Sequence, residues 1–135
     1  MSETQKKYVL KGIELMSFVM SEKAENFNEK KPVRINFTQE QKINQAENIV
    51  FKYTTIEILD SEDTNVLIKL KVACSFFFLN FADVVNHNEK GEAVILHDVN
   101  MDLARICVGT ARGILYTQLK GTYLKSAILP LLPFE

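Results

Sequence analysis

The sequence predicts an α+β domain in which the strands come first and a long helix comes last. Two strand-like segments, 49–59 and 66–81, flank the acidic turn DSEDTN at 60–65 and predict a long antiparallel hairpin. The segment 100–121 instead has apolar residues at helical spacing. Because strands and helices do not alternate, this order is typical of an antiparallel sheet with separate helices and not of repeated βαβ units.

Two more strands are expected before the hairpin. The segment 7–20 is rich in apolar residues, and Gly12 within it predicts a β-bulge or a close backbone contact. The segment 32–38, PVRINFT, alternates apolar and polar residues and can start at Pro32, which is typical of a half-buried strand. We expect the polar residues 39–48 to form a connection.

The end of the hairpin, VACSFFFLNF at 72–81, is uncharged and contains four phenylalanines. Alternation along a strand sends Phe76 and Phe78 to one face and Phe77, Leu79 and Phe81 to the other. One face can enter the core of the domain, so the second face needs another cover.

The last third of the chain is predicted to hold a loop, a helix and an apolar tail. Residues 83–97 form the loop, and Asn100 can cap a helix that ends near Gly121. Gly109 and Gly113 lie inside this helix, where they are either simply tolerated or mark the close approach of another element.

Length and composition fit one globular domain, 1–135, that needs no disulfide or metal for stability. The chain is 47% hydrophobic and 24% charged, and its net charge is −1 with dispersed lysines, which argues against a nucleic-acid surface. It begins without the apolar stretch of a signal peptide, and no apolar run is long enough to span a bilayer. We therefore expect a cytoplasmic protein without membrane insertion.

No arrangement of residues predicts an enzyme, a metal site or a cofactor. Cys74 and Cys107 lie far apart in apolar runs and predict buried free thiols rather than a disulfide or redox pair. His87 and His97 lack metal-ligand spacing. A nucleophile–base pair of Cys107 and His97 is disfavoured because this cysteine falls on the apolar side of its helix. We expect no catalytic residue and no metal ligand.

The sequence instead contains surplus apolar surface. It comprises the second face of 73–81, the strand 33–37 and the C-terminal segment ILPLLPF at 128–134. Burial in the core of the domain and self-association both remain open as explanations.

The order of these parts resembles the SecB family of export chaperones, and more closely its shorter SecB-like relatives. YVLKGIELMSF at 8–18 resembles the opening strand of the family, and KPVRINF at 31–37 its short second strand. SEDTNVLIKLKVACSFF at 61–77 resembles the long hairpin arm, LARICV at 103–108 the start of the first helix, and GTYLKSAILPLLPF at 121–134 the close.

The resemblance implies a four-stranded antiparallel sheet with helices on one face, in subunits that form homodimers or homotetramers. It implies an ATP-independent holdase that needs no cofactor and binds unfolded polypeptide, a preprotein or an antitoxin, in long apolar grooves. The positions that match client-binding residues of the family are Val33, Ile35, Phe37, Phe76, Phe78, Leu124, Leu129 and Leu131. We expect oligomer contacts along the helix, at Leu103, Cys107, Gly109 and Gly113.

One difference from the family concerns its motor partner, the SecA ATPase, which export SecB docks through acidic residues on the outer sheet face. This chain has Gly12, Met16 and Lys69 at the matching positions. A net charge of −1 gives little field to steer a basic partner. We therefore expect no docking to SecA, and the export, toxin–antitoxin and solitary roles stay open.

Two alternatives belong to other functional classes. A carrier of a small molecule or lipid would enclose a pocket between the apolar faces. An interaction module would use the same apolar face to bind one fixed partner. A bound ligand in a monomer would favour the first, and selectivity for a single partner would favour the second.

Overall fold

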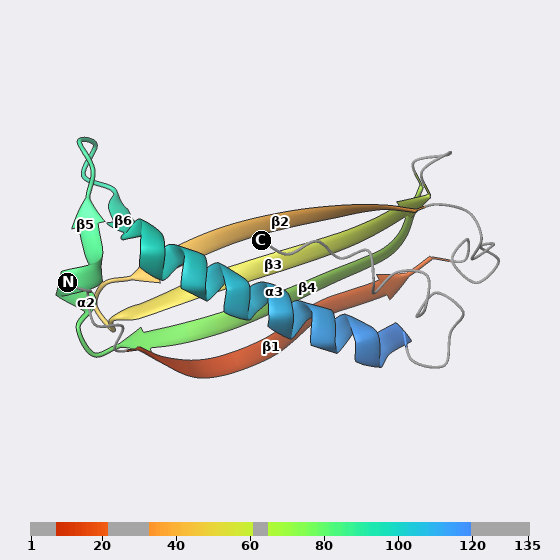
Figure 1. Ribbon diagram of the computed structural model, residues 1–135, viewed down its shortest axis with the longest axis horizontal. Helices are drawn as coiled ribbons and strands as arrows, with labels where there is room; N and C mark the ends of the chain where they lie inside the picture. Colours follow the sequence, from red (N-terminus) through yellow and green to blue (C-terminus); the bar gives the residue numbers. More distant parts are fainter. Residues whose placement is uncertain (1–7, 22–32, 61–64, 120–135) are drawn as a thin grey trace.

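The computed structural model describes residues 8–21, 33–60 and 65–119. Four long strands form one antiparallel sheet in the order β1-β4-β3-β2, so that β1 and β2 are its edges (Figure 1). Their bounds are β1 Tyr8–Met20, β2 Val33–Asn44, β3 Ile49–Asp60 and β4 Val66–Phe78. A long helix, α3 (His97–Leu119), crosses one face obliquely from the β2 side to the β1 side. The α+β class and the four-stranded antiparallel sheet with its helix on one face are confirmed.

The core lies between α3 and the central strands β3 and β4. Every fourth residue of α3 is buried, and all six of these are at most 1% exposed: Val99, Leu103, Cys107, Ala111, Leu115 and Leu119. On β4 the apolar residues alternate with polar or small ones, which places one apolar set under the helix: Ile68, Leu70, Val72, Cys74, Phe76 and Phe78. We call this face of the sheet the helix side and the opposite face the outer side.

Two bulges shape β1. The pairing of β1 with β4 shifts between Leu10 and Gly12 and again between Leu15 and Ser17. Each bulge adds one residue and so reverses which alternate residues face the helix. The spacing of apolar residues follows this rule, and the helix side of β1 carries Tyr8, Leu10, Ile13, Leu15, Phe18 and Met20.

Gly12 confirms the predicted bulge and close contact together. A Cβ atom at this position would lie 3.1 Å from the Ser75 hydroxyl oxygen, which itself donates a 3.5 Å hydrogen bond to the Gly12 carbonyl. The first bulge of β1 therefore closes onto β4 at a residue without a side chain.

The predicted connection at 39–48 is wrong for its first six residues, because β2 continues to Asn44. Residues from Thr38 to Lys42 are polar and exposed, yet each pairs with β3. An edge strand can be polar on both faces where nothing packs on it, so its sequence resembles a loop. The turn proper is short and ends at Asn48, whose φ of 59° is left-handed.

The strand predicted at 66–81 is shorter than expected, since β4 ends at Phe78. Leu79 and Asn80 form a turn before α2 (Phe81–Val84). The predicted loop at 83–97 contains a small hairpin of β5 (Val85–His87) and β6 (Ala93–Ile95). These elements close one end of the core, where the Phe81 ring packs edge-on to Phe78 at 6.4 Å.

The helix starts three residues earlier than predicted, and Asn100 does not cap it. The backbone N–H of Asn100 already donates to the Leu96 carbonyl at 2.9 Å, so this residue lies within the first turn. Its side-chain oxygen instead accepts a hydrogen bond from Lys52 on β3. The helix is described to Leu119, and Gly121 lies outside the described residues.

Candidate functional site: an apolar edge strand

Exposed apolar side chains concentrate on β1. Of the ten large apolar residues that are exposed in the described part of the chain, six lie on this strand. They are 38–59% exposed, and we call them the β1 strip: Val9, Leu10, Ile13, Leu15, Met16 and Val19. The strip follows a 13-residue strand, which spans about 40 Å.

The strip wraps around the edge of the sheet. Leu10, Ile13 and Leu15 lie on the helix side, because they pair with the buried residues of β4. Val9 and Val19 lie on the outer side, and Met16 is the extra residue of the second bulge. The helix packs over β3 and β4, and this half of β1 lies beside it without a described cover (Figure 1).

The backbone of β1 is also available along one side. Among the described strands β1 pairs only with β4, so as an edge strand it has alternate N–H and C=O groups that point away from the sheet. The bulges divide this edge into three short stretches, because each one shifts the register. A polypeptide added at this edge would pair over a few residues at a time.

The strip offers substantial binding energy but not a complete interface. Burying half of a large apolar side chain contributes roughly 1 kcal/mol, so the six residues offer on the order of 5 kcal/mol. The loss of translational and rotational freedom on association opposes this binding energy. Backbone hydrogen bonds to an added strand supply the remaining binding energy without regard to the sequence of that strand.

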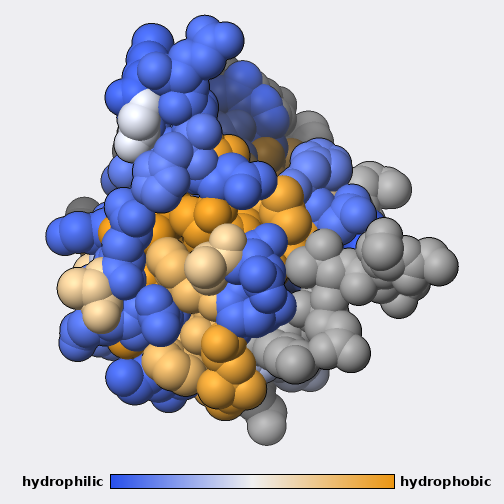
Figure 2. All heavy atoms as spheres, turned by 90° about the vertical axis from the view of Figure 1, so that its left-hand side faces the viewer, coloured by the Kyte–Doolittle hydropathy of each residue, from blue (hydrophilic) through white to orange (hydrophobic). Residues whose placement is uncertain are grey.

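Apolar surface is also exposed at the end of the molecule where β1 begins. Seen from the end that carries the β5–β6 hairpin, hydrophobic side chains gather below the hydrophilic hairpin (Figure 2). The start of β1 lies at this end, together with Leu79, which is 69% exposed. The apolar surface therefore continues from the edge strand onto the turn after β4.

The predicted client-binding residues divide into three groups. Val33, Ile35 and Phe37 lie together on the helix side of β2, half-buried and packed against the core. Phe76 and Phe78 are 0% exposed beneath α3, with the Tyr8 ring 5.9 and 5.3 Å away. This placement gives them a packing role in the core of the subunit. Three lie outside the described residues: Leu124, Leu129 and Leu131.

The predicted oligomer contacts also divide. Leu103 and Cys107 are 0% exposed within the core of the subunit itself. Gly109 and Gly113 lie on the exposed side of α3, where an added Cβ atom would meet no atom within 4 Å. Of the four predicted positions, the two glycines are the ones that leave helix backbone open to another molecule.

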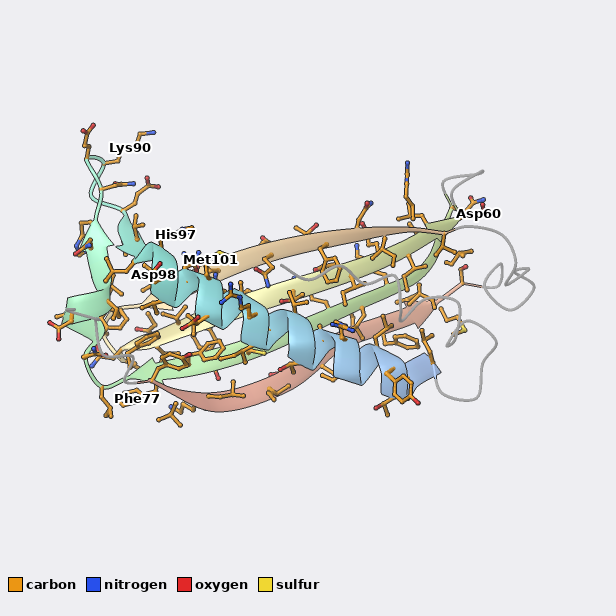
Figure 3. All side chains as sticks on the ribbon, in the orientation of Figure 1. Asp60, Phe77, Lys90, His97, Asp98 and Met101 are labelled. Carbon is orange, nitrogen blue, oxygen red and sulfur yellow. The ribbon has the colours of Figure 1, made fainter. Side chains whose placement is uncertain are left out.

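Phe77, which faces away from the core, packs on the outer side of the sheet. Phe77 lies at one end of this side, opposite Val9 on β1 and Ile49 on β3 (Figure 3). It is half-buried in a row of apolar residues beside the stacked rings of Phe51 and Tyr53, whose centroids lie 6.5 Å apart.

The other half of the outer side is charged. Lys71 lies 5.5 Å from the centre of the Tyr53 ring, and Lys69 is 3.8 Å from Glu57. Along β4 the outer side of the sheet therefore changes from charged at Lys69 and Lys71 to apolar at Phe77, as the sequence predicts.

Beneath α3, the helix side becomes more polar toward β2. One cross-strand row reads Gln41, Lys52, Cys74 and Ile13 from β2 to β1. Lys52 is 4% exposed, and burial lowers its pKa, which the nearby Cys107 partly opposes. The polar residues of this row and the β1 strip thus lie toward opposite edges of the sheet.

The two histidines lie on different elements, His87 on β5 and His97 at the start of α3. His87 is hydrogen-bonded to Gln45 at 3.1 Å, whereas His97 and Asp98 lie in the first turn of α3 (Figure 3). Among the described residues no three His, Cys, Asp or Glu side chains lie close enough together to hold a metal. No helix in that part of the chain is long and apolar enough to cross a membrane.

The β1 strip is the feature that the sequence analysis missed. The apolar spacing of two, three, two, three and two residues along 8–20 was a usable signal for two bulges. That β1 is an edge depends on its distant pairing with β4 and cannot be read from local spacing.

The scan against family models gives no match, and neither does the search of curated proteins. Among solved structures, the chain is similar to the SecB-like chaperone Rv1957 of Mycobacterium tuberculosis, solved in complex with a ChAD peptide from the Rv1956 HigA1 antitoxin. The TM-score is 0.48 and the sequence identity 15%, over 95% of this chain and 84% of that chain.

Proposed function

We propose that this protein is a SecB-like holdase that binds unfolded polypeptide without ATP, through apolar surface and backbone pairing at the edge of its sheet. The observation that carries the proposal is the β1 strip, which combines six exposed apolar side chains with a strand edge that no other described strand covers. Apolar burial and main-chain hydrogen bonds both tolerate many sequences, as a general chaperone requires. In this proposal the protein is a binding protein of the cytoplasm and not an enzyme.

The predicted residues of β2 form the second part of the proposed client surface. Val33, Ile35 and Phe37 are half-buried, so each keeps some apolar area for a client while supporting the core. The two edges bound the sheet on opposite sides, and α3 crosses the face between them from the β2 side to the β1 side (Figure 1). An extended client that contacts both edges would have to pass across or around the subunit.

Self-association is part of the same proposal. We expect a homodimer or homotetramer with contacts on the exposed side of α3, at Gly109 and Gly113, where helix backbone is uncovered. Lys69 on the outer side is engaged with Glu57, and the chain lacks an acidic surplus, so SecA docking is not expected.

The test is titration calorimetry of the purified protein with one polypeptide in unfolded and folded forms, with native mass measured by light scattering. We expect micromolar or tighter binding of the unfolded form alone, by a dimer or tetramer. Equal binding to both forms, or binding to neither, would contradict a holdase. Unfolded preprotein and unfolded antitoxin serve as parallel clients to separate export from a toxin–antitoxin role.

The apolar strip favours one rival, a module that binds a single partner strand. Such a module would pair one fixed sequence with β1 and ignore unrelated unfolded chains. A panel of unrelated unfolded polypeptides in the same calorimeter distinguishes the two, because a holdase binds most of them.

A further inference from the structure

The two cysteines of the chain meet in the core. Cys74 lies on the helix side of β4 and is 1% exposed, while Cys107 lies on the buried side of α3 and is 0% exposed. Both are free thiols of one buried core cluster, on the facing surfaces of β4 and α3. The fold therefore brings together two residues that are distant in the sequence.

Polar groups surround this pair within an otherwise apolar core. Lys52 pairs with Cys74 across β3 and β4, and its ammonium is near enough to Cys107 to favour an ionised thiol. The Thr54 and Thr110 side chains hydrogen-bond to Cys107 and Cys74 respectively. Lys52 is itself held by Asn100 on α3.

The two thiols change one another's pKa in opposite directions. The hydrogen bond from Cys107 lowers the pKa of Cys74, against the opposing effect of burial. The same bond, together with burial, raises the pKa of Cys107. One proton thus leaves the pair more readily and the other is retained.

We propose that Cys74 and Cys107 form an oxidisable dithiol whose disulfide fastens α3 to β4. The proposal rests on the contact between the two thiols and does not depend on the proposed chaperone function. A disulfide in a reducing compartment is typically transient and redox-sensing.

Hydrogen peroxide is the class of oxidant that fits so buried a pair, because it is little larger than water. The Cys74 thiolate attacks one peroxide oxygen, the O–O bond breaks, and the leaving hydroxide takes up a proton to become water. The sulfur of Cys107 then attacks the resulting sulfenic acid, with loss of its proton and release of a second water. Two thiols and one peroxide thus give one disulfide and two waters.

The expected consequence is a more stable domain. The crosslink would close the chain from β4 through the β5–β6 hairpin to α3, which restricts the unfolded state. For a loop of this length and a domain of this size, the melting temperature should rise by about 10 °C.

The experiment treats the folded, reduced protein with hydrogen peroxide, blocks remaining thiols and digests with trypsin without reduction. Cleavage after Lys71, Lys90, Arg105 and Arg112 yields peptides 72–90 and 106–112, which a Cys74–Cys107 disulfide would join. We expect that linked pair in monomeric chains, loss of two hydrogen atoms in the intact mass, and the higher melting temperature. The Cys107→Ala variant should give neither link nor rise.

A variant of the neighbouring lysine tests the role of the surroundings. Lys52→Met should slow disulfide formation about tenfold, because it removes the charge that favours loss of the Cys107 proton when this thiol attacks the sulfenic acid. Thiols that stay reduced, over-oxidise without a link, or join only between chains or only after unfolding would overturn the proposal. The wild-type comparison of reduced and oxidised protein remains decisive even if a variant does not fold.

Discussion

The two edge strands, β1 and β2, both present backbone groups that another chain could pair with, but the side chains they expose are opposite in character. β2 exposes Thr38, Gln39, Glu40, Gln41 and Lys42 along its second half, and such polar, charged edges resist pairing with other chains. β1 instead exposes the apolar β1 strip over almost its entire length. An edge that invites pairing is a liability in a protein without a partner, so the contrast points to β1 as a binding edge.

The helix side of the sheet follows the same gradient from β2 to β1. Toward β2 the helix side contains Gln39, which donates a 3.2 Å hydrogen bond to Thr54, and the buried Lys52. Toward β1 it contains Ile13 and Leu15 beside Cys74 and Val72. The polar side is satisfied by contacts within the chain, whereas the apolar side is left incomplete.

The largest expected effect is on client binding when the apolar edge is charged. Ile13 is 51% exposed, so Ile13→Asp should leave the fold intact and weaken binding of an unfolded chain about a hundredfold, because the client would cover an unpaired carboxylate as well as lose apolar contact. Thr38→Asp is the matched control, with the same new charge on the opposite edge, and should change affinity by less than about twofold. Calorimetry gives the affinity and circular dichroism the fold. Equal losses in both variants would remove the distinction between the edges.

A second prediction compares stability at the two edges. Phe37 packs against the core from β2, so Phe37→Ala should lower the free energy of unfolding by about 2 kcal/mol. Ile13→Ala should lower it by only about 1 kcal/mol, because half of that side chain already meets solvent. Urea unfolding measures both. A larger loss for Ile13 would mean that the β1 strip is covered in the native protein.

The smallest effect concerns the buried lysine on the polar side. Burial lowers the pKa of Lys52 in the folded protein, whereas in the unfolded chain its pKa keeps the ordinary value of 10.5. The folded protein therefore binds this proton less tightly than the unfolded chain does. The free energy of unfolding contributed by this residue therefore rises as pH rises from the lowered pKa toward 10.5. Lys52→Met should stabilise the protein by about 1 kcal/mol at pH 7 and lose that advantage near pH 10. Urea unfolding at both pH values tests this, and an advantage that does not shrink would contradict it.

Local patterns predicted much of the fold. The alternation along 49–59 and 66–78 indicated the central hairpin, Gly12 indicated a bulge, and the apolar runs around Cys74 and Cys107 indicated buried free thiols. Each of these depends on neighbours in the sequence. The segment 39–44 was mistaken for a connection because a polar edge strand has no apolar face to signal it.

The candidate site depended on long-range pairing and was less predictable. The exposure of Leu10 and Leu15 follows from β1 being an edge beside an oblique helix, which no local spacing encodes. The burial of Phe76 and Phe78 follows from α3 lying on their side of β4 rather than the other. The apolar residues were recognisable, but which of them face solvent was decided by the packing of distant segments.

The most direct test is hydrogen–deuterium exchange of the protein with and without a bound unfolded polypeptide. If β1 is the binding edge, the client should slow exchange of its outward-facing backbone amides in 8–20, with little change in the polar half of β2 at 38–44. Slowed exchange confined to β2, or unchanged exchange along β1 under saturating client, would contradict the central claim.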